Sequence, residues 1–138
     1  MDNLKPILLI EDDIVDALSA KRAFKEVNVQ NDVVHVKNGE EALEFLQDDK
    51  NKKPCLLLLD INMPKMNGIE FLEERAKEEK LRLIPCIVLT TSNDDQDKYN
   101  SYNLNIAGYM IKPLEYENFV KVIHTIDMYW TLSKTVDL

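Results

Sequence analysis

Five short apolar runs alternate along the chain with five longer segments whose apolar residues recur at helical spacing. The runs are PILLI, DVVHV, CLLLL, IPCIVLT and GYMI, at residues 6–10, 32–36, 55–59, 84–90 and 108–111. The helical segments are 14–27, 40–49, 69–80, 94–104 and 116–130. Strict alternation of strand and helix is typical of a parallel sheet covered by helices on both faces. The sequence therefore predicts an α/β fold, a doubly wound five-stranded parallel sheet with five helices.

Composition limits the classes of partner. A chain of 138 residues with 45% apolar residues can bury a core as one domain. Its net charge of −8 disfavours nucleic acid and anionic membrane surfaces as partners. No apolar run reaches the roughly 20 residues that span a bilayer, and the first residues, MDNLKP, do not resemble a signal peptide. We expect a cytoplasmic protein in which Cys55 and Cys86 are buried, reduced thiols.

Polar residues follow the apolar runs at the ends where parallel sheets place their functional sites. These residues are Glu11, Asp12, Asp13, Asp60, Thr90 and Lys112. Because the carboxyl ends of parallel strands meet at one edge, we expect carboxylates, a hydroxyl and an ammonium group to gather there. Asp13 stands directly before a helical segment and is predicted to be its N-cap, so it is excluded from the site.

Crowded carboxylates repel one another, and a divalent cation relieves the repulsion. A set of oxygen ligands suits Mg²⁺. A site for free phosphate or flavin would instead need a glycine-rich first loop, and the chain has only three glycines. With a metal present, a phosphoryl group could be transferred to a carboxylate, its oxygens held by the cation, a hydroxyl and an ammonium.

Four segments, ILLIEDD, LLLLDINMPKMNG, PCIVLTTS and GYMIKPL, resemble the signature segments of the response-regulator receiver domain, the CheY-like family. The resemblance covers nearly all of the chain. It implies one receiver domain over residues 1–138, the strand order 2-1-3-4-5 and phosphorylation of an aspartate by a sensor histidine kinase or phosphotransfer protein. It also implies a signalling switch in place of an enzyme. The segments LTTS and FVKVIHTIDMYWTL are similar to single-domain regulators that partner bacterial phytochromes, so we expect a receiver without an output domain.

The resemblance assigns roles around the metal. Asp60 matches the phosphoacceptor. Asp12 is expected to bind Mg²⁺ directly, and Glu11 directly or through water, although many members of the family have Asp at the position of Glu11. Asn62 is expected to offer its backbone carbonyl to the metal.

Further roles concern the response to phosphorylation. Thr90 matches the switch hydroxyl and Tyr109 the switch aromatic. Lys112 matches the lysine that pairs with the phosphoryl group. The resemblance also implies a cis peptide bond between Lys112 and Pro113.

Other interpretations stay open at this point. Asp60 could cap a turn, Thr90 could reflect β-propensity, and Tyr109 could serve packing alone. A phosphohydrolase of the haloacid-dehalogenase type also uses an aspartyl phosphate, but that family has an acid two residues after the nucleophile, where this chain has Asn62. A receiver-like scaffold without phosphorylation is disfavoured because every expected site position is filled.

The last helical segment carries more apolar residues than one core-facing stripe requires. The stripe is predicted to be Phe119, Val120, Ile123, Ile126 and Trp130. Three further apolar residues, Val122, Tyr129 and Leu132, are then expected outside it. In receiver domains, activated subunits pair through the face formed here by 94–104, 108–111 and 116–130. We therefore expect a homodimer through this face, the alternative being that these residues pack against a C-terminal extension.

Overall fold

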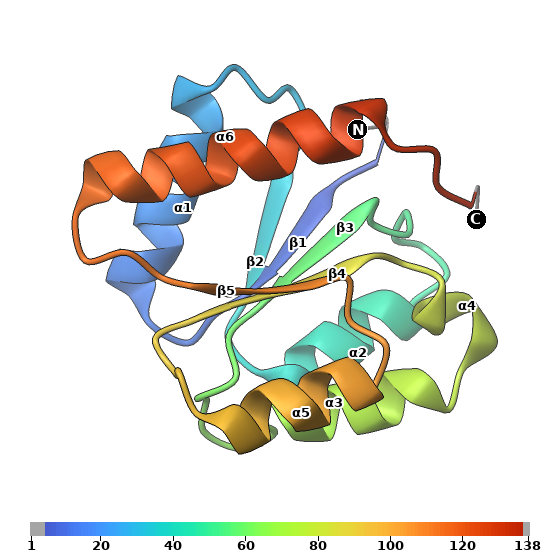
Figure 1. Cartoon of the computed structure of the whole chain (residues 1–138). Helices are drawn as coiled ribbons and strands as arrows, with labels where there is room; N and C mark the ends of the chain where they lie inside the picture. Colours follow the sequence, from blue (N-terminus) through green and yellow to red (C-terminus); the bar gives the residue numbers. More distant parts are fainter. Residues whose placement is uncertain (1–4, 137–138) are drawn as a thin grey trace.

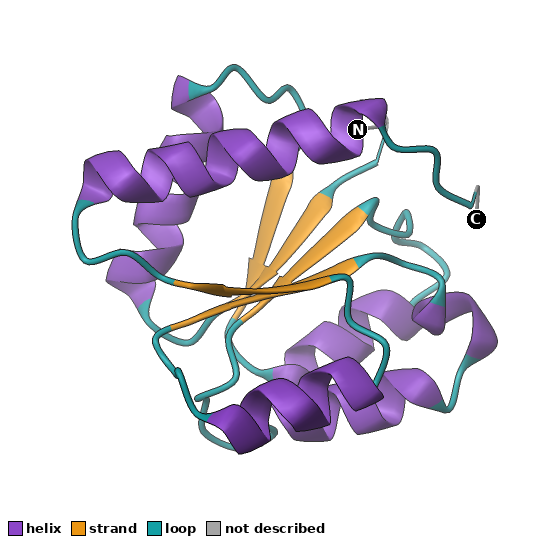
Figure 2. Ribbon diagram, viewed as in Figure 1, coloured by secondary structure: helices purple, strands orange, loops and turns teal. Residues whose placement is uncertain are grey.

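Five parallel strands form one sheet between two layers of helices (Figures 1 and 2). The computed structural model describes residues 5–136, so residues 1–4 and 137–138 of the predicted domain lie outside the described part. The strands are β1 (Ile7–Ile10), β2 (Val33–Val36), β3 (Leu56–Leu59), β4 (Cys86–Thr90) and β5 (Gly108–Ile111). Their order in the sheet is β2-β1-β3-β4-β5, which confirms the predicted topology.

Six helices connect and follow the strands, one more than the sequence predicted. They are α1 (Ile14–Glu26), α2 (Gly39–Gln47), α3 (Gly68–Ala76), α4 (Glu79–Arg82), α5 (Asp95–Asn103) and α6 (Tyr116–Leu132). Helices α1 and α6 lie side by side on one face of the sheet, and α2, α3 and α5 cover the other (Figure 1). Among the described residues, no helix is long and apolar enough to cross a membrane.

The leucine run of β3 contributes to two separate cores. Leu56 and Leu58 pack with α1 and α6, whereas Leu57 and Leu59 pack with α2 and α3. All four side chains are fully buried. A central strand with helices on both faces must be apolar at every position, which explains why the run shows no alternation.

Side-chain caps set the beginning of each long helix except α6. The Asp13 carboxylate accepts hydrogen bonds from the backbone amides of Val15 at 2.8 Å and Asp16 at 3.0 Å. This confirms the predicted N-cap of α1. Asn67 and Glu70 form a reciprocal capping box at the start of α3. The caps matter for the site because α1 and α3 begin just after the loops that follow β1 and β3.

The segment predicted as one helix over 69–80 is two helices. Helix α3 ends at Ala76, and the four-residue helix α4 begins at Glu79. The physical reason is Arg75, whose buried guanidinium draws the following chain around itself. It donates hydrogen bonds of 2.7–3.4 Å to the carbonyls of Leu81, Arg82, Ile84 and Leu104. A straight helix could not present these carbonyls to one side chain within it.

The residues predicted to face the core from α6 do so, and one residue that was predicted to lie outside this stripe also contacts the core. Phe119, Ile123 and Ile126 are buried, and Val120 and Trp130 are half-buried against the same core. Val122 was predicted to be surplus, but it also packs against this core, because its direction along the helix lies close to that of Phe119 and Ile126. Tyr129 and Leu132 are exposed, at 61% and 79% of their surface.

Two local predictions need correction. The described residues contain no cis peptide bond, so the bond between Lys112 and Pro113 is trans. The Lys112 amide donates to the Thr90 carbonyl at 2.8 Å, which extends the β4–β5 ladder and directs the lysine without a cis bond. Cys86 within β4 is buried, as predicted, but Cys55 is only half-buried because it precedes β3 at the sheet margin.

Gly68 permits the close turn between β3 and α3. A Cβ atom at this position would lie 2.7 Å from the Asp60 carbonyl oxygen and 2.7 Å from the Ile61 Cα. We expect Gly68→Ala to lower the free energy of unfolding by about 1–3 kcal/mol through overpacking, measured by urea denaturation. Gly108→Ala is the control, since no heavy atom lies within 4 Å of its Cβ position. Equal losses in both variants would contradict the close-approach explanation.

Candidate functional site

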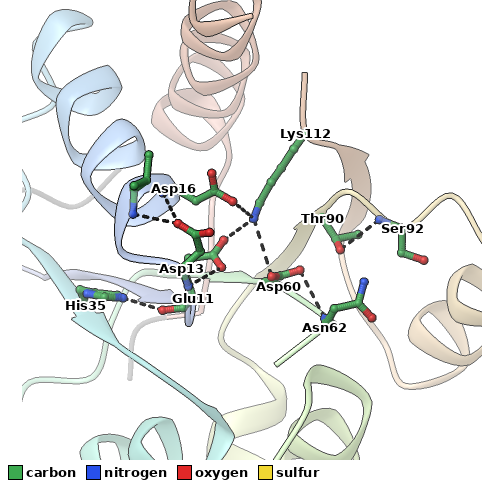
Figure 3. Close-up of polar contacts among 10 residues, drawn as sticks. Glu11, Asp13, Asp16, His35, Asp60, Asn62, Thr90, Ser92 and Lys112 are labelled. Carbon is green, nitrogen blue, oxygen red and sulfur yellow. Dashed lines mark hydrogen bonds and ion pairs between the residues drawn. The ribbon is translucent and has the colours of Figure 1, made fainter. Parts of the chain in front are cut away.

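Five of the predicted site residues lie together at the carboxyl edge of β1, β3, β4 and β5, which are neighbours in the sheet: Glu11, Asp60, Asn62, Thr90 and Lys112 (Figure 3). Backbone hydrogen bonds continue past the strand ends. The Asp60 amide donates to the Ile10 carbonyl at 3.0 Å, and the Glu11 amide donates to the Val36 carbonyl at 3.0 Å. The sheet therefore fixes the backbone from which each acidic side chain projects.

Three carboxylates lie close enough to share one cation. Ligand oxygens of Glu11, Asp12 and Asp60 lie within 4.8 Å of one another. Glu11 and Asp60 are buried, at 3% and 7% exposure, whereas Asp12 is exposed. Asn62 follows in the exposed loop, and its backbone amide is 3.4 Å from Asp60 Oδ1. The structure thus brings together the acids that the sequence proposed as metal ligands.

Lys112 reaches into this group from the end of β5. Its ammonium donates a hydrogen bond to Glu11 Oε1, donates another to Asp16 Oδ2 at 2.9 Å, and lies 3.7 Å from Asp60 Oδ2. The lysine side chain is largely buried, with 11% of its surface exposed. Lys112 is therefore part of this group and not a solvent-exposed surface lysine.

The charges at the site are unequal, because several carboxylates face one ammonium. Burial raises the pKa of Glu11 to about 7, against the lowering effect of its hydrogen bond with Lys112, and the charge of Asp60 raises it further. Burial alone would lower the pKa of Lys112, but Glu11 and the other acids outweigh it and raise this pKa. Both shifts mean that the site favours additional positive charge. The donor set and its charge therefore fit a divalent cation.

Thr90 and Tyr109 are connected through Ser92. Thr90 is fully buried, and its hydroxyl oxygen accepts a hydrogen bond from the Ser92 amide at 3.3 Å. The Tyr109 hydroxyl donates to the Ser92 carbonyl at 2.9 Å. The Ser92 hydroxyl in turn donates to Asp97 Oδ2, in the first turn of α5, at 2.6 Å. The loop between β4 and α5 therefore joins both predicted switch residues to that helix.

Sequence reasoning missed two of these contacts. Asp16 was overlooked because an acid in the first turn of a helix is usually explained by the helix dipole. Asp97 was overlooked for the same reason. The signal that could have found Asp16 is topological, since α1 begins at the sheet edge where the other acids lie. His35 is close to the site, but its ring nitrogen contacts only the backbone carbonyl of Glu11, at 2.6 Å, in agreement with a structural role.

Comparison with known proteins identifies the family. Residues 7–124 match the family described as response regulator receiver domain. The chain belongs to the response regulator receiver family. It is 35% identical over 127 residues to the probable methanogenesis regulatory protein FilR2 of Methanothrix harundinacea, covering 90% of this chain and 82% of FilR2. It is 32% identical over 136 residues to the response regulator Rcp1 of Synechocystis sp., covering 96% and 92% of the two chains.

Solved structures of receiver proteins agree with this assignment. The phosphorylated cyanobacterial phytochrome response regulator RcpA superimposes with a TM-score of 0.88 at 30% identity, covering 97% of this chain and 99% of RcpA. The Mn²⁺-bound form of Rcp1 gives a TM-score of 0.87 at 31% identity, covering 97% and 99%.

Membership fixes the general function. Receiver domains act in two-component signal transduction and accept a phosphoryl group on an aspartate, and they are signalling modules with a histidine kinase or phosphotransfer protein as partner. The family match removes the phosphohydrolase alternative. The acidic cluster, together with the Mn²⁺-bound Rcp1 structure, supports a divalent metal site.

A charge-matched pair of variants tests the metal site. Asp12→Ala removes one of the three clustered carboxylates, so we expect the dissociation constant for Mg²⁺ or Mn²⁺ to rise at least about tenfold in isothermal titration calorimetry. Asp13→Ser removes a neighbouring charge while keeping an N-cap, and it should change the constant less than about twofold. Equal weakening by both variants would show that net charge, and not coordination, governs binding.

Proposed function

We propose that Asp60 accepts the phosphoryl group, in an Mg²⁺-dependent reaction, from a phosphohistidine of a sensor kinase or phosphotransfer protein. The observation that carries this proposal is the position of Asp60 at the end of the fully buried strand β3, within the acidic cluster and 3.7 Å from the Lys112 ammonium. Among the described residues, Glu11 shares the acidic cluster and the contact with Lys112, but both of its carboxylate oxygens already accept hydrogen bonds, from Lys112 and from the Asp13 amide. The whole chain, residues 1–138, is included in the proposed receiver domain.

Phosphoryl transfer requires the protein mainly to position the nucleophile and to neutralise negative charge. An Asp60 carboxylate oxygen forms a bond to phosphorus as the bond from phosphorus to the histidine nitrogen breaks, and the released imidazole takes a proton from solvent. Glu11, Asp12, Asp60 and the Asn62 carbonyl would hold the cation, which supplies neutralisation of negative charge when bound. Lys112 and the Thr90 hydroxyl would donate hydrogen bonds to phosphoryl oxygens.

The signal is a change in surface shape. A phosphoryl group adds negative charge and acceptor oxygens at Asp60. Thr90 moves toward it and leaves space that Tyr109 fills. Since Ser92 bonds to both residues and to Asp97, this movement reaches α5. The phosphoryl group thereby shifts a two-state equilibrium of the face formed by α5, β5 and α6 without any enzymatic output.

An exposed apolar rim beside the site fits a protein phosphodonor. Ile14, Val15 and Leu18 on α1 each expose more than half of their surface, and Leu114 after β5 is fully exposed. Apolar groups grouped at a polar site mark a docking surface for another protein. The similarity to the phytochrome response regulator RcpA supports a kinase of the phytochrome type as the donor.

The acceptor assignment is tested by modification of the purified protein. With Mg²⁺ and acetyl phosphate, the wild type should gain one phosphoryl group by mass spectrometry, and Asp60→Asn should gain none because its amide is not a nucleophile. Asp49→Asn, which changes an exposed aspartate remote from the strand ends, should be modified like the wild type. Modification of Asp60→Asn to the wild-type extent would refute the proposal.

We further propose that the α5, β5 and α6 face pairs two copies of the chain. Ile111 at the end of β5 and Tyr129 and Leu132 on α6 expose apolar surface here. Tyr129 and Leu132 remain uncovered by the described part of the chain, which disfavours packing against a C-terminal extension over residues 133–136. Burying these side chains against a second copy is favourable by about 25 cal/mol per Å² of apolar surface.

Sedimentation with and without beryllofluoride, a phosphoryl mimic, tests the dimer. We expect beryllofluoride to shift the wild type toward a dimer at micromolar concentration. Leu132→Ser should weaken this dimer, because it removes apolar surface from the proposed interface. Leu18→Ser, which removes a comparably exposed leucine on α1, should leave it intact. A wild type that stays monomeric in both conditions would refute the proposal.

A further inference from the structure

Lys112 has a hydrogen-bonded acidic partner outside the proposed metal site. We propose that Asp16 is a positioning residue for phosphoryl transfer, which holds the Lys112 ammonium at Asp60 when Glu11 turns its carboxylate to the cation. This inference rests on the proposed function. It assigns a role to an acid of α1 that belongs neither to the clustered ligands nor to the N-cap.

Glu11 is both a hydrogen-bond acceptor for Lys112 and a proposed metal ligand. Both of its carboxylate oxygens already have partners, since Oε1 accepts from Lys112 and Oε2 accepts from the Asp13 amide at 3.2 Å. Glu11 is also one of the three acids whose ligand oxygens lie within 4.8 Å of one another. A cation bound to Glu11 therefore competes with Lys112 for the same carboxylate.

Asp60 does not form a hydrogen bond with Lys112. Their nearest charged atoms are 3.7 Å apart, beyond hydrogen-bond distance, whereas Asp16 Oδ2 lies 2.9 Å from the ammonium (Figure 3). Asp16 thus remains the hydrogen-bonded partner once Glu11 is engaged elsewhere. Its backbone is fixed, because its amide donates to the Asp13 cap at 3.0 Å.

A cavity beside the site gives the Lys112 side chain room to move away from Asp60. A cavity of about 110 Å³ lies between α1 and the loop after β5, and both Asp16 and Lys112 line it. Its other walls are Ser19, Pro113, Leu114, Tyr116 and Phe119. Without the Asp16 carboxylate, a lysine chain with free rotamers can swing into this space. The ion pair between Asp16 and Lys112, which both line the cavity, keeps the ammonium close to Asp60.

A double-mutant cycle tests the role of Asp16 in the reaction. Asp16→Ala should slow phosphorylation by acetyl phosphate about fivefold, the size of a coupling between contacting residues. In the Lys112→Met background, adding Asp16→Ala should change the remaining rate less than about twofold, because Asp16 acts through Lys112. Asp16→Glu, which keeps the carboxylate, should restore part of the rate. Glu26→Ala, which breaks an ion pair with Arg22 on the same helix, is the control and should leave the rate unchanged.

A second readout does not depend on phosphorylation. In lysine-labelled protein with Mg²⁺ and no phosphodonor, ¹³C relaxation should show greater mobility of Lys112 Cε in Asp16→Ala than in the wild type or Glu26→Ala. Unchanged mobility, or equal slowing by Asp16→Ala with and without Lys112, would overturn the inference. If the wild type takes no phosphoryl group at all, the proposed function fails, and the mobility of Lys112 still decides whether Asp16 positions it.

Discussion

The repulsion among acids at one end of a buried sheet is the constraint around which this domain is arranged. Glu11 and Asp60 are held out of water, and their backbones are bonded to neighbouring strands, so neither can move away from the other. One ammonium, that of Lys112, offsets only part of the charge. Burial, together with the charge of Asp60, raises the pKa of Glu11, and the neighbouring acids raise the pKa of Lys112 against the effect of its burial. A cation and a phosphoryl group together suit such a site, since each supplies a charge that the other needs.

The strength of the arrangement lies in the division between rigid and adjustable parts. Strand β3 is immobilised by cores on both faces, so Asp60 at its end keeps a fixed position. The loop between β4 and α5 is attached by single hydrogen bonds through Ser92. Bonds of this kind contribute about 1 kcal/mol each, which a new charge at the site can outweigh. Under the proposed function, phosphoryl transfer takes place on the rigid side of the sheet edge, and the change of shape on the adjustable side.

The sequence predicted the elements well, because apolar periodicity and caps are local properties. All five strands and the N-cap at Asp13 follow from it, and the predicted element bounds lie within two residues of those observed outside the segment 69–80. Topology and the signature segments predicted which strand-end residues gather at one edge, but the individual side-chain contacts of other residues did not follow from them. The break after α3 depends on carbonyls that Arg75 meets only in the folded chain. The pairing of Asp16 with Lys112 joins residues 96 positions apart, and although the segment GYMIKPL identifies Lys112, no local pattern identifies Asp16 as its partner.

Arg75 anchors the carboxyl end of helix α5. Its guanidinium bonds the Leu104 carbonyl, just past the end of α5, to the same cluster that holds the turns around α4. At the other end, α5 is tied to the sheet edge through the side chains of Asp97 and Ser92, and of its own residues only Ser101 is buried. Helix α5 is therefore attached at both ends, by the buried Arg75 guanidinium at its carboxyl end and by the Ser92 hydroxyl at its amino end. Under the proposed function, a displacement of Ser92 beside Asp60 would act on the amino end of α5 while Arg75 holds its carboxyl end in place.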